Sequence, residues 1–343
     1  MTLPLIIEIL VSNKNSTAFL FCCLFTLLVG ISLLLAFKKK ERKLNVKDTI
    51  LITALSLPIL VLFSSLPFYF GTEVQDFSEA FFEATSGFTT AGSSIYLNIE
   101  ELSYGILMWR SMLQWVGGIG IIIFAIAVIP IFNVGSMKLF TQDWSEKPHD
   151  LHYRTTELAK LLGIIYVTFT FIIFILLYLS GLSFFDSLCH AMTTIATGGF
   201  STKNESVAYF NNIFAEIIIV IGMLMASLPF TLYLSCIRKN FSIFRDSQVI
   251  FFFFIVLFFI ISLTSWMYVK NNIDILTALR VSIFNGVSII TGTGYTTENF
   301  SSWGSFSNTL LLTMMLIGGC SGSTTGGFKV YRIQVLFLII VKD

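Results

Sequence analysis

The sequence repeatedly contains apolar runs that are about as long as a bilayer core is thick. These runs lie near 17–37, 49–70, 105–132, 159–180, 209–236, 248–269 and 306–341. About 20 apolar residues in a helix cross the hydrocarbon core of a membrane. Only 12% of the 343 residues are charged, whereas soluble domains carry about 25%. The sequence therefore predicts an all-α polytopic membrane protein, whose last run is overlong and interrupted.

Lysine and arginine are concentrated in a few connections between these runs. They gather at 38–47, 133–160 and 237–246 and in the C-terminal segment. The connection 71–104 has no lysine or arginine, although it carries six acidic residues. Loops rich in lysine and arginine stay on the cytoplasmic side of a membrane. We therefore expect a multi-pass protein of the plasma (inner) membrane, with the basic loops and the C terminus in the cytoplasm.

Three segments rich in glycine and threonine interrupt the apolar pattern on the other side. They are ATSGFTTAGSS at 84–94, TIATGGFSTKN at 194–204 and SIITGTGYTTENFSSW at 288–303. Each lies between two longer apolar runs and is too polar at its end to cross the bilayer. Irregular backbone is tolerated at membrane depth only where it lines protein or a water-filled cavity. We expect each segment to include a short helix that dips into the membrane and returns.

The three segments also resemble one another when Gly92, Gly199 and Gly294 are aligned. Eight positions earlier the residues are small, namely Ala84, Ala191 and Gly286. Nine positions earlier they are polar, namely Glu83, His190 and Asn285. Each dip begins near an acid that could cap a short helix, at Asp76, Asp186 and Asp274. This self-similarity predicts three copies of one unit, in which a pore loop lies between two membrane helices.

Glycine and threonine in such turns suit the coordination of a cation that has lost its water. Glycine adopts backbone angles that turn successive carbonyls to one side. Rings of carbonyl oxygens replace the water shell of the ion, as in potassium channels. A tight surface turn would use similar residues, so one such segment alone would favour that interpretation. Three segments in register favour an ion filter.

Five motifs resemble the Trk/Ktr/HKT superfamily of potassium transporters, and within it the Trk-type (TrkH-like) pore subunit. They are SGFTTAG at 86–92, RSMLQWVGGIGIIIFAIAVIP at 110–130, TIATGGFST at 194–202, TGTGYTT at 291–297 and IGGCSGSTTGGFKVYR at 317–332. The resemblance implies repeated membrane-helix, pore-loop, membrane-helix units around a pseudo-fourfold pore. It implies potassium as the transported ion, with no catalytic cofactor. The potassium-binding filter residues that it implies are Thr90, Ala91, Gly92, Thr197, Gly198, Gly199, Gly292, Thr293 and Gly294.

The segment GGCSGSTTGGFK at 318–329 is a separate glycine-rich stretch. It departs from the phosphate-loop pattern because Phe328 separates Gly327 from Lys329. The resemblance implies an intramembrane loop that lies under the filter and acts as a gate. A plain packing kink is the alternative interpretation. The gate residues that the resemblance implies are Gly318, Gly319, Cys320, Ser321, Gly322, Ser323, Gly326 and Gly327.

The resemblance also divides the chain into parts. Residues 1–47 hold two extra helices, of which the first is short, and 48–140 and 141–240 are the first two pore repeats. Residues 241–343 are a third repeat with a broken second helix. A fourth repeat has no counterpart in the sequence, so we expect that the chain alone does not close a pore.

Two functions are compatible with the sequence. One is potassium uptake across the plasma membrane through a backbone-carbonyl filter with an intramembrane gate. The other is a truncated, non-conducting remnant or an accessory membrane subunit. The partners implied by the resemblance are a cytoplasmic nucleotide-binding regulatory ring (TrkA-like), a second copy of the chain in a homodimer, and the lipid bilayer, with no nucleic acid.

Two charged residues within the apolar runs have more than one interpretation. Arg110, at the outer end of its run, is either a snorkelling anchor or the partner of an acid in a pore loop. Glu216 is a functional candidate because acids inside membrane helices are rare, unless it lies near the outer end of its helix. The sequence has no Ser/His/Asp set or paired carboxylates for catalysis, so an enzyme is not indicated.

Overall fold

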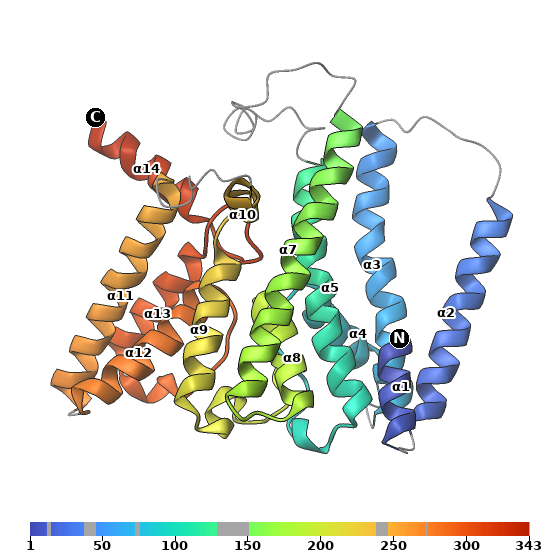
Figure 1. Ribbon diagram of the computed structural model, residues 1–343, viewed down its shortest axis with the longest axis horizontal. Coiled ribbons are helices and arrows are strands. Elements are labelled where there is room, and N and C mark those ends of the chain that lie inside the picture. The colour runs from blue at the N-terminus through green and yellow to red at the C-terminus, as the bar shows by residue number, and fades with distance from the viewer. Residues whose placement is uncertain are drawn as a thin grey trace.

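The computed structural model describes residues 1–11, 15–37, 46–72, 76–128, 151–237, 246–271 and 273–342. Within these ranges the regular structure is helical, and no strand occurs. Two helices, α1 (Thr2–Leu10) and α2 (Ser16–Ala36), come first. The longest helices stand roughly parallel to one another, as expected for a bundle that crosses a membrane (Figure 1).

Three similar units follow, each with a long helix, a short helix and a second membrane helix. The first contains α3 (Val46–Gly71), α4 (Phe77–Phe88) and α5 (Tyr104–Val128). The second contains α7 (Leu151–Leu179), α8 (Phe184–Ile195), α9 (Ile213–Ser227) and α10 (Phe230–Ile237). The third contains α11 (Ser247–Asn271), α12 (Ile275–Ile290), α13 (Ser305–Ile317) and α14 (Val330–Lys342). This recurrence confirms the predicted fold class.

The long helices present apolar side chains outward. Helices α2, α3, α7 and α11 each contain a window long and apolar enough to cross a membrane, and at most 33% of each window is buried. On α11, for example, Phe254 and Leu257 are 66% and 57% exposed. Apolar helices with so much uncovered surface are stable when lipid covers them. The chain is therefore a multi-pass membrane protein.

The short helices α4, α8 and α12 lie in the lower half of the bundle in Figure 1. Each contacts the membrane helices of its own unit, and neighbouring units meet where α5 packs against α8 and α9 packs against α12. Small residues allow this close packing. A Cβ atom at Gly117 of α5 would lie 1.9 Å from the carbonyl oxygen of Phe88, where α4 ends. The short helices are thus held at fixed depth inside the bundle.

Of the three predicted helix caps, Asp76 and Asp274 occupy the cap position and Asp186 does not. Asp76 occupies the cap position of α4 without a side-chain hydrogen bond to the helix. Ser183 caps α8, accepting a hydrogen bond from the amide of Asp186, and Asp186 instead accepts one from the Thr202 hydroxyl at 2.5 Å. Asp274 caps α12 as predicted, through the amide of Leu276. Ser183 and Asp186 have the spacing of a capping box, and the Ser183 hydroxyl also donates to the Asp186 carboxylate at 2.7 Å.

The second membrane helix of the second unit is broken, which the apolar run 209–236 did not predict. Helices α9 and α10 meet at an angle of 93°. Leu228 is extended between them, because the following Pro229 disfavours helical backbone at that position and has no amide hydrogen to donate. The predicted interruption of the last run is confirmed, since residues 318–329 separate α13 from α14.

The helix ends that adjoin the basic segments lie on one side of the bundle. The end of α2 and the starts of α3, α7 and α11 are all at the upper edge of Figure 1. Most of the basic loops themselves lie outside the described residues, at 38–45, 133–150 and 238–245. The predicted repeat boundaries at 140 and 240 also lie outside them.

Candidate functional site: three turns and a loop

The short helices α4, α8 and α12 end in the same hydrogen-bonded turn. In each, an amide bonds back five residues, from Ala91 to Ser86, Gly198 to Thr193 and Thr293 to Ser288, always at 2.9 Å. The preceding amide bonds back three residues, at 3.0 to 3.1 Å. This pair of bonds satisfies the last carbonyls of a helix and requires a left-handed residue just beyond its end. The three segments that align in sequence therefore form the same local structure.

The left-handed residue of each turn is followed, two positions later, by a second one. The first position is Thr90, Thr197 or Gly292, with φ of 58°, 51° and 72°. The second is the aligned glycine, Gly92, Gly199 or Gly294, with φ of 78°, 77° and 84°. A threonine with positive φ is strained by about 1–2 kcal/mol, so the surrounding structure must hold it. We call residues 90–92, 197–199 and 292–294 the candidate filter turns.

The backbones of neighbouring candidate filter turns approach each other closely. A Cβ atom at Gly92 would lie 2.4 Å from the carbonyl oxygen of Gly198. A Cβ atom at Gly199 would lie 1.8 Å from the carbonyl oxygen of Thr293. Only glycine fits at these two positions. Gly294 differs, because no described atom lies within 4 Å of its Cβ position.

The polar residue nine positions before each aligned glycine braces the chain that leaves the turn. Glu83 accepts hydrogen bonds from the amide of Ile95 at 3.0 Å and from the Ser94 hydroxyl. Asn285 accepts one from the amide of Thr297, which is the matching position, at 3.2 Å. His190 and the Ser201 hydroxyl are 3.0 Å apart. The sequence register identified these three residues, and the structure gives them a shared supporting role.

Arg110 is the buried partner of one of these braces rather than a snorkelling anchor. Its side chain is 1% exposed and lies 2.8 Å from the Glu83 carboxylate. It also donates to the Ser201 carbonyl of the second unit at 3.2 Å. Its guanidinium lies 4.1 Å from the centre of the Phe200 ring. Arg110 therefore joins the first unit to the chain that follows the second candidate filter turn.

Gln114, one helical turn after Arg110 on α5, contacts the second candidate filter turn directly. Its side-chain amide donates to the Gly198 carbonyl at 2.6 Å and accepts from the Phe200 amide at 3.0 Å. The side chain is completely buried. Sequence reasoning missed this residue, because a glutamine on an apolar helix has no spacing signal of its own.

The residue after each aligned glycine packs differently in the three units. Tyr295 places its hydroxyl against the Thr193 hydroxyl of α8, in the preceding unit. Phe200 lies close to Gly87 of α4, again in the preceding unit, where an added Cβ would be 3.3 Å from its ring. Ser93 is the small equivalent in the first unit. Aromatic rings therefore anchor the second and third turns to the short helix before them.

The glycine-rich stretch 318–327, which we call the candidate gate loop, begins and ends at the same place in the third unit, because its two end glycines lie against each other. Cβ atoms at Gly318 and Gly327 would each lie under 3 Å from backbone atoms at the other end. The loop lies beside two candidate filter turns. The Thr324 and Thr197 hydroxyls are 3.2 Å apart, and the amide nitrogen of Gly326 lies 3.7 Å from the Cβ position of Gly292.

The broken end of α9 holds this loop. The carbonyl of Ser227 accepts from the Cys320 amide at 3.1 Å. The carbonyl of Ala226 accepts from both the amide and the hydroxyl of Thr324, at 3.4 and 3.2 Å. A continuous helix would bond these carbonyls internally, so the break at Pro229 makes them available. The helix break that the sequence did not predict is thus part of the docking of the loop.

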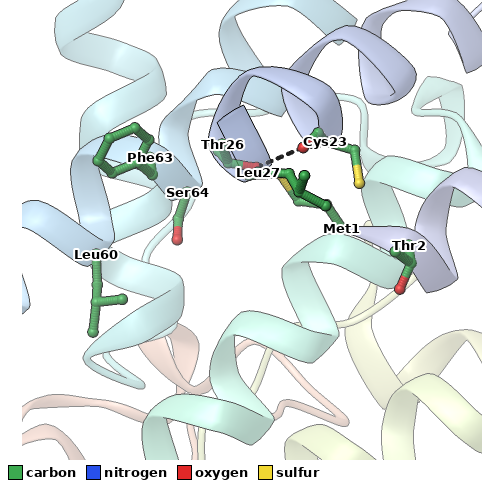
Figure 2. Close-up of a pocket in the computed structure, with 8 residues that line it drawn as sticks. All are labelled: Met1, Thr2, Cys23, Thr26, Leu27, Leu60, Phe63 and Ser64. Carbon is green, nitrogen blue, oxygen red and sulfur yellow. Dashed lines mark hydrogen bonds between the residues drawn. The ribbon is translucent and has the colours of Figure 1, made fainter. Parts of the chain in front are cut away.

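Two other features lie apart from this site. Glu216 is in the first turn of α9 and forms a two-point ion pair with Arg280 of α12, at 2.6 and 2.7 Å, which makes it a structural link. A cavity near the N terminus is lined by residues of α1, α2 and α3 (Figure 2). No side chain that lines it is charged, and these helices contain none of the candidate filter turns.

The repeated dipping helices and converging backbone turns define a class of membrane transport protein with pore loops. Comparison with known proteins gives the family. The TrkH family model, described as a cation transport protein, matches residues 15–269 and 248–343. The chain belongs to the TrkH family.

Individual relatives agree with this assignment. The Trk system potassium uptake protein TrkI of Halomonas elongata is 36% identical, over 99% of this chain and 69% of the relative. TrkH of Escherichia coli K12 is 33% identical, over 98% of this chain and 71% of the relative. The crystal structure of the potassium transporter TrkH from Vibrio parahaemolyticus superposes with a TM-score of 0.90 at 30% identity, covering 99% of this chain and 71% of that one.

Proposed function

We propose that this chain takes up potassium ions across the membrane, through a path formed by the candidate filter turns. The observation that carries the proposal is the threefold recurrence of one turn, with left-handed residues at matching positions and neighbouring backbones in contact. The relatives are named as potassium uptake proteins, which supports potassium as the ion. The ion is substrate here, and the proposal assigns the chain no catalytic cofactor.

The proposed ligands are the backbone carbonyls of the nine residues in the three turns. Alternating left-handed and ordinary backbone angles let successive carbonyls face one side. A set of carbonyls at fixed positions replaces the water shell of a potassium ion and discriminates against sodium. The braces at Glu83, His190 and Asn285 would keep these positions fixed.

The proposed path needs a further wall beside the third turn. Gly92 and Gly199 each face a carbonyl of the next unit, whereas Gly294 faces open space among the described residues. We propose that a fourth turn, supplied in the same chain or by another, packs there and completes a pseudo-fourfold pore. Residues 48–140, 141–240 and 241–343 are the three pore repeats in this proposal, and 1–47 forms the additional helices.

The candidate gate loop is proposed to control the path from the inner side. Its contacts with Thr197 and near Gly292 support a position next to two turns at once. Hydrogen bonds to the end of α9 would hold it there, and these are replaceable by water when the loop moves. The glycine positions allow such a loop to adopt more than one backbone path.

The proposed orientation has the basic segments in the cytoplasm. The helix ends that border them share one side of the bundle (Figure 1), which agrees with the lysine and arginine bias. The regulatory partner on that side is proposed to be a nucleotide-binding ring, and the assembly a homodimer in the lipid bilayer. The word "system" in the relatives' names fits an assembly of several components.

Rubidium uptake into liposomes tests the proposal. The purified chain is reconstituted alone and with the part of a TrkH relative that this chain does not match. We expect uptake of rubidium in preference to sodium in the second arm. Absence of rubidium uptake in both arms, with the protein correctly inserted, would favour a non-conducting remnant or an accessory subunit instead.

A further inference from the structure

Gln114 is placed to control the geometry of the second candidate filter turn from the neighbouring helix α5. Its side chain bonds the Gly198 carbonyl and the Phe200 amide, at 2.6 and 3.0 Å. These two groups flank Gly199, the glycine that approaches the third unit most closely. One side chain therefore fixes the backbone on both sides of that glycine.

The residue at position 198 is glycine because Gln114 fills the space where a side chain would lie. The three atoms nearest to a Cβ at Gly198 all belong to the Gln114 amide, at 2.3, 2.5 and 2.8 Å. The equivalent residues Ala91 and Thr293 carry side chains. Gly198 has no positive φ, so its identity is explained by this contact and not by backbone strain.

The contact also crosses between units. Gln114 lies on α5 of the first unit, as does Arg110, which bonds the Ser201 carbonyl and covers the Phe200 ring. Both side chains are buried and both their polar ends are bonded. A buried hydrogen bond of this kind holds its partner firmly, because breaking it would leave a polar group without water or another partner.

We propose that Gln114 is a positioning residue that sets the orientation of the Gly198 carbonyl and thereby the preference for potassium over sodium. This proposal rests on the proposed function of the three turns. A donor bonded to one lone pair of the carbonyl fixes the distance at which its oxygen meets an ion. Losing the donor lets the carbonyl relax toward a smaller ion, so sodium gains relative to potassium.

The test compares three variants with a matched control in the reconstituted assembly that contains the unmatched part of a relative. Gln114→Met keeps the length of the side chain and removes both hydrogen bonds. Gln114→Glu keeps the acceptor for Phe200 and removes the donor to Gly198. The double variant Gln114→Ala with Gly198→Ala refills the space without either bond. Gln334→Met, on α14, is the control for a change of glutamine to methionine elsewhere.

We expect the ratio of rubidium to sodium uptake to fall about fivefold in Gln114→Met and in the double variant, the size of one lost hydrogen bond. Gln114→Glu should also lower it, and Gln334→Met should leave it unchanged. An unchanged ratio in Gln114→Met would overturn the proposal. A ratio restored by the double variant would overturn it as well, because packing alone would then explain the role of Gln114.

A second measurement separates this proposal from the proposed function and does not require transport. Hydrogen exchange of the Phe200 amide, followed in peptides that cover 198–202, should be faster in Gln114→Met than in the original chain. It should stay slow in Gln114→Glu. If the assembly with the unsubstituted chain shows no selective uptake, the proposed function fails. Equal exchange in Gln114→Met and the unsubstituted chain would show that Gln114 does not hold this turn.

Discussion

The candidate filter turns and the candidate gate loop have nearly the same composition but are held in different ways. Each turn caps its own short helix through backbone hydrogen bonds, and Gly92 and Gly199 face the backbone of another unit. The loop closes on itself at Gly318 and Gly327 and is attached to the end of α9 by a few hydrogen bonds. In the turns, glycine lets the backbones of neighbouring units pack closely. In the loop, glycine lets the chain reverse its direction.

Two segments of similar composition are therefore held by different kinds of contact. In the second turn, the buried side chains of Arg110 and Gln114 on α5 brace the backbone. In the loop, Cys320 packs into the hydrophobic core, and hydrogen bonds join the loop to the end of α9 and to Gln248 of α11. We therefore expect Gly92 and Gly199 of the turns to tolerate almost no change, whereas Gly326 of the loop has an open Cβ position and should tolerate alanine.

The largest effect is expected from a glycine-to-alanine pair that compares the two regions directly. Gly199→Ala places a Cβ atom 1.8 Å from the Thr293 carbonyl oxygen, at a φ of +77°. It should abolish rubidium uptake. Gly326→Ala in the loop meets no atom within 4 Å and should leave uptake close to its original rate. Equal loss in both variants would contradict the distinction between the two regions.

The second-largest effect is expected on stability, when the arginine partner of a buried carboxylate is removed. Arg110→Met leaves the fully buried Glu83 carboxylate without its partner, which should cost about 3–5 kcal/mol of stability. Arg280→Met removes the partner of Glu216, but the Arg280 side chain is 38% exposed. It should cost less, roughly 1 kcal/mol. Thermal unfolding in detergent measures both, and a larger loss in Arg280→Met would show that the brace is not the stronger link.

A smaller effect is expected on selectivity from the first turn. Gly92→Ser introduces a side chain 2.4 Å from the Gly198 carbonyl oxygen, which should displace that oxygen and raise sodium uptake relative to rubidium. Gly30→Ser, on α2, is the control and should leave selectivity unchanged, because no atom lies within 4 Å of its Cβ position. The ratio of the two ion fluxes is the measurement. An unchanged ratio in Gly92→Ser would remove Gly92 from the proposed filter.

The smallest effect is expected in the loop. Thr324→Val keeps the shape of the side chain but removes its hydroxyl bonds with Ala226 and Thr197. The loop should leave its docked position more often, and the rubidium flux should rise a few-fold, in line with about 1 kcal/mol per hydrogen bond. The preference for rubidium over sodium should not change. A shift in selectivity would place this loop in the ion-selecting structure.

Much of the fold follows from the sequence because its signals are local. Apolar runs fix the membrane helices, and the small and polar residues aligned with Gly92, Gly199 and Gly294 fix the register of the units. The positive φ at Thr90 and Thr197 could not be predicted from threonine, which rarely adopts it. Those angles depend on the helix cap and on packing between units.

Long-range contacts account for the rest of what the sequence did not indicate. Pro229 lies within an apolar run and is a weak signal by itself, yet the break it causes supplies the carbonyls that hold the loop. Gln114 became significant only when α5 was seen beside the second turn. The sequence left Arg110 between two interpretations, and its position 2.8 Å from Glu83 decides between them. The assignment of ion-binding residues stays a prediction.

The most direct test of the central proposal is the location of the ion. Crystals of the assembly grown with rubidium in place of potassium would give anomalous X-ray density at each bound ion. We expect density between residues 90–92, 197–199 and 292–294, which is lost when sodium replaces rubidium. Density found only elsewhere in the bundle, or density at the turns that is equally strong in the Gly199→Ala variant, would contradict the proposal.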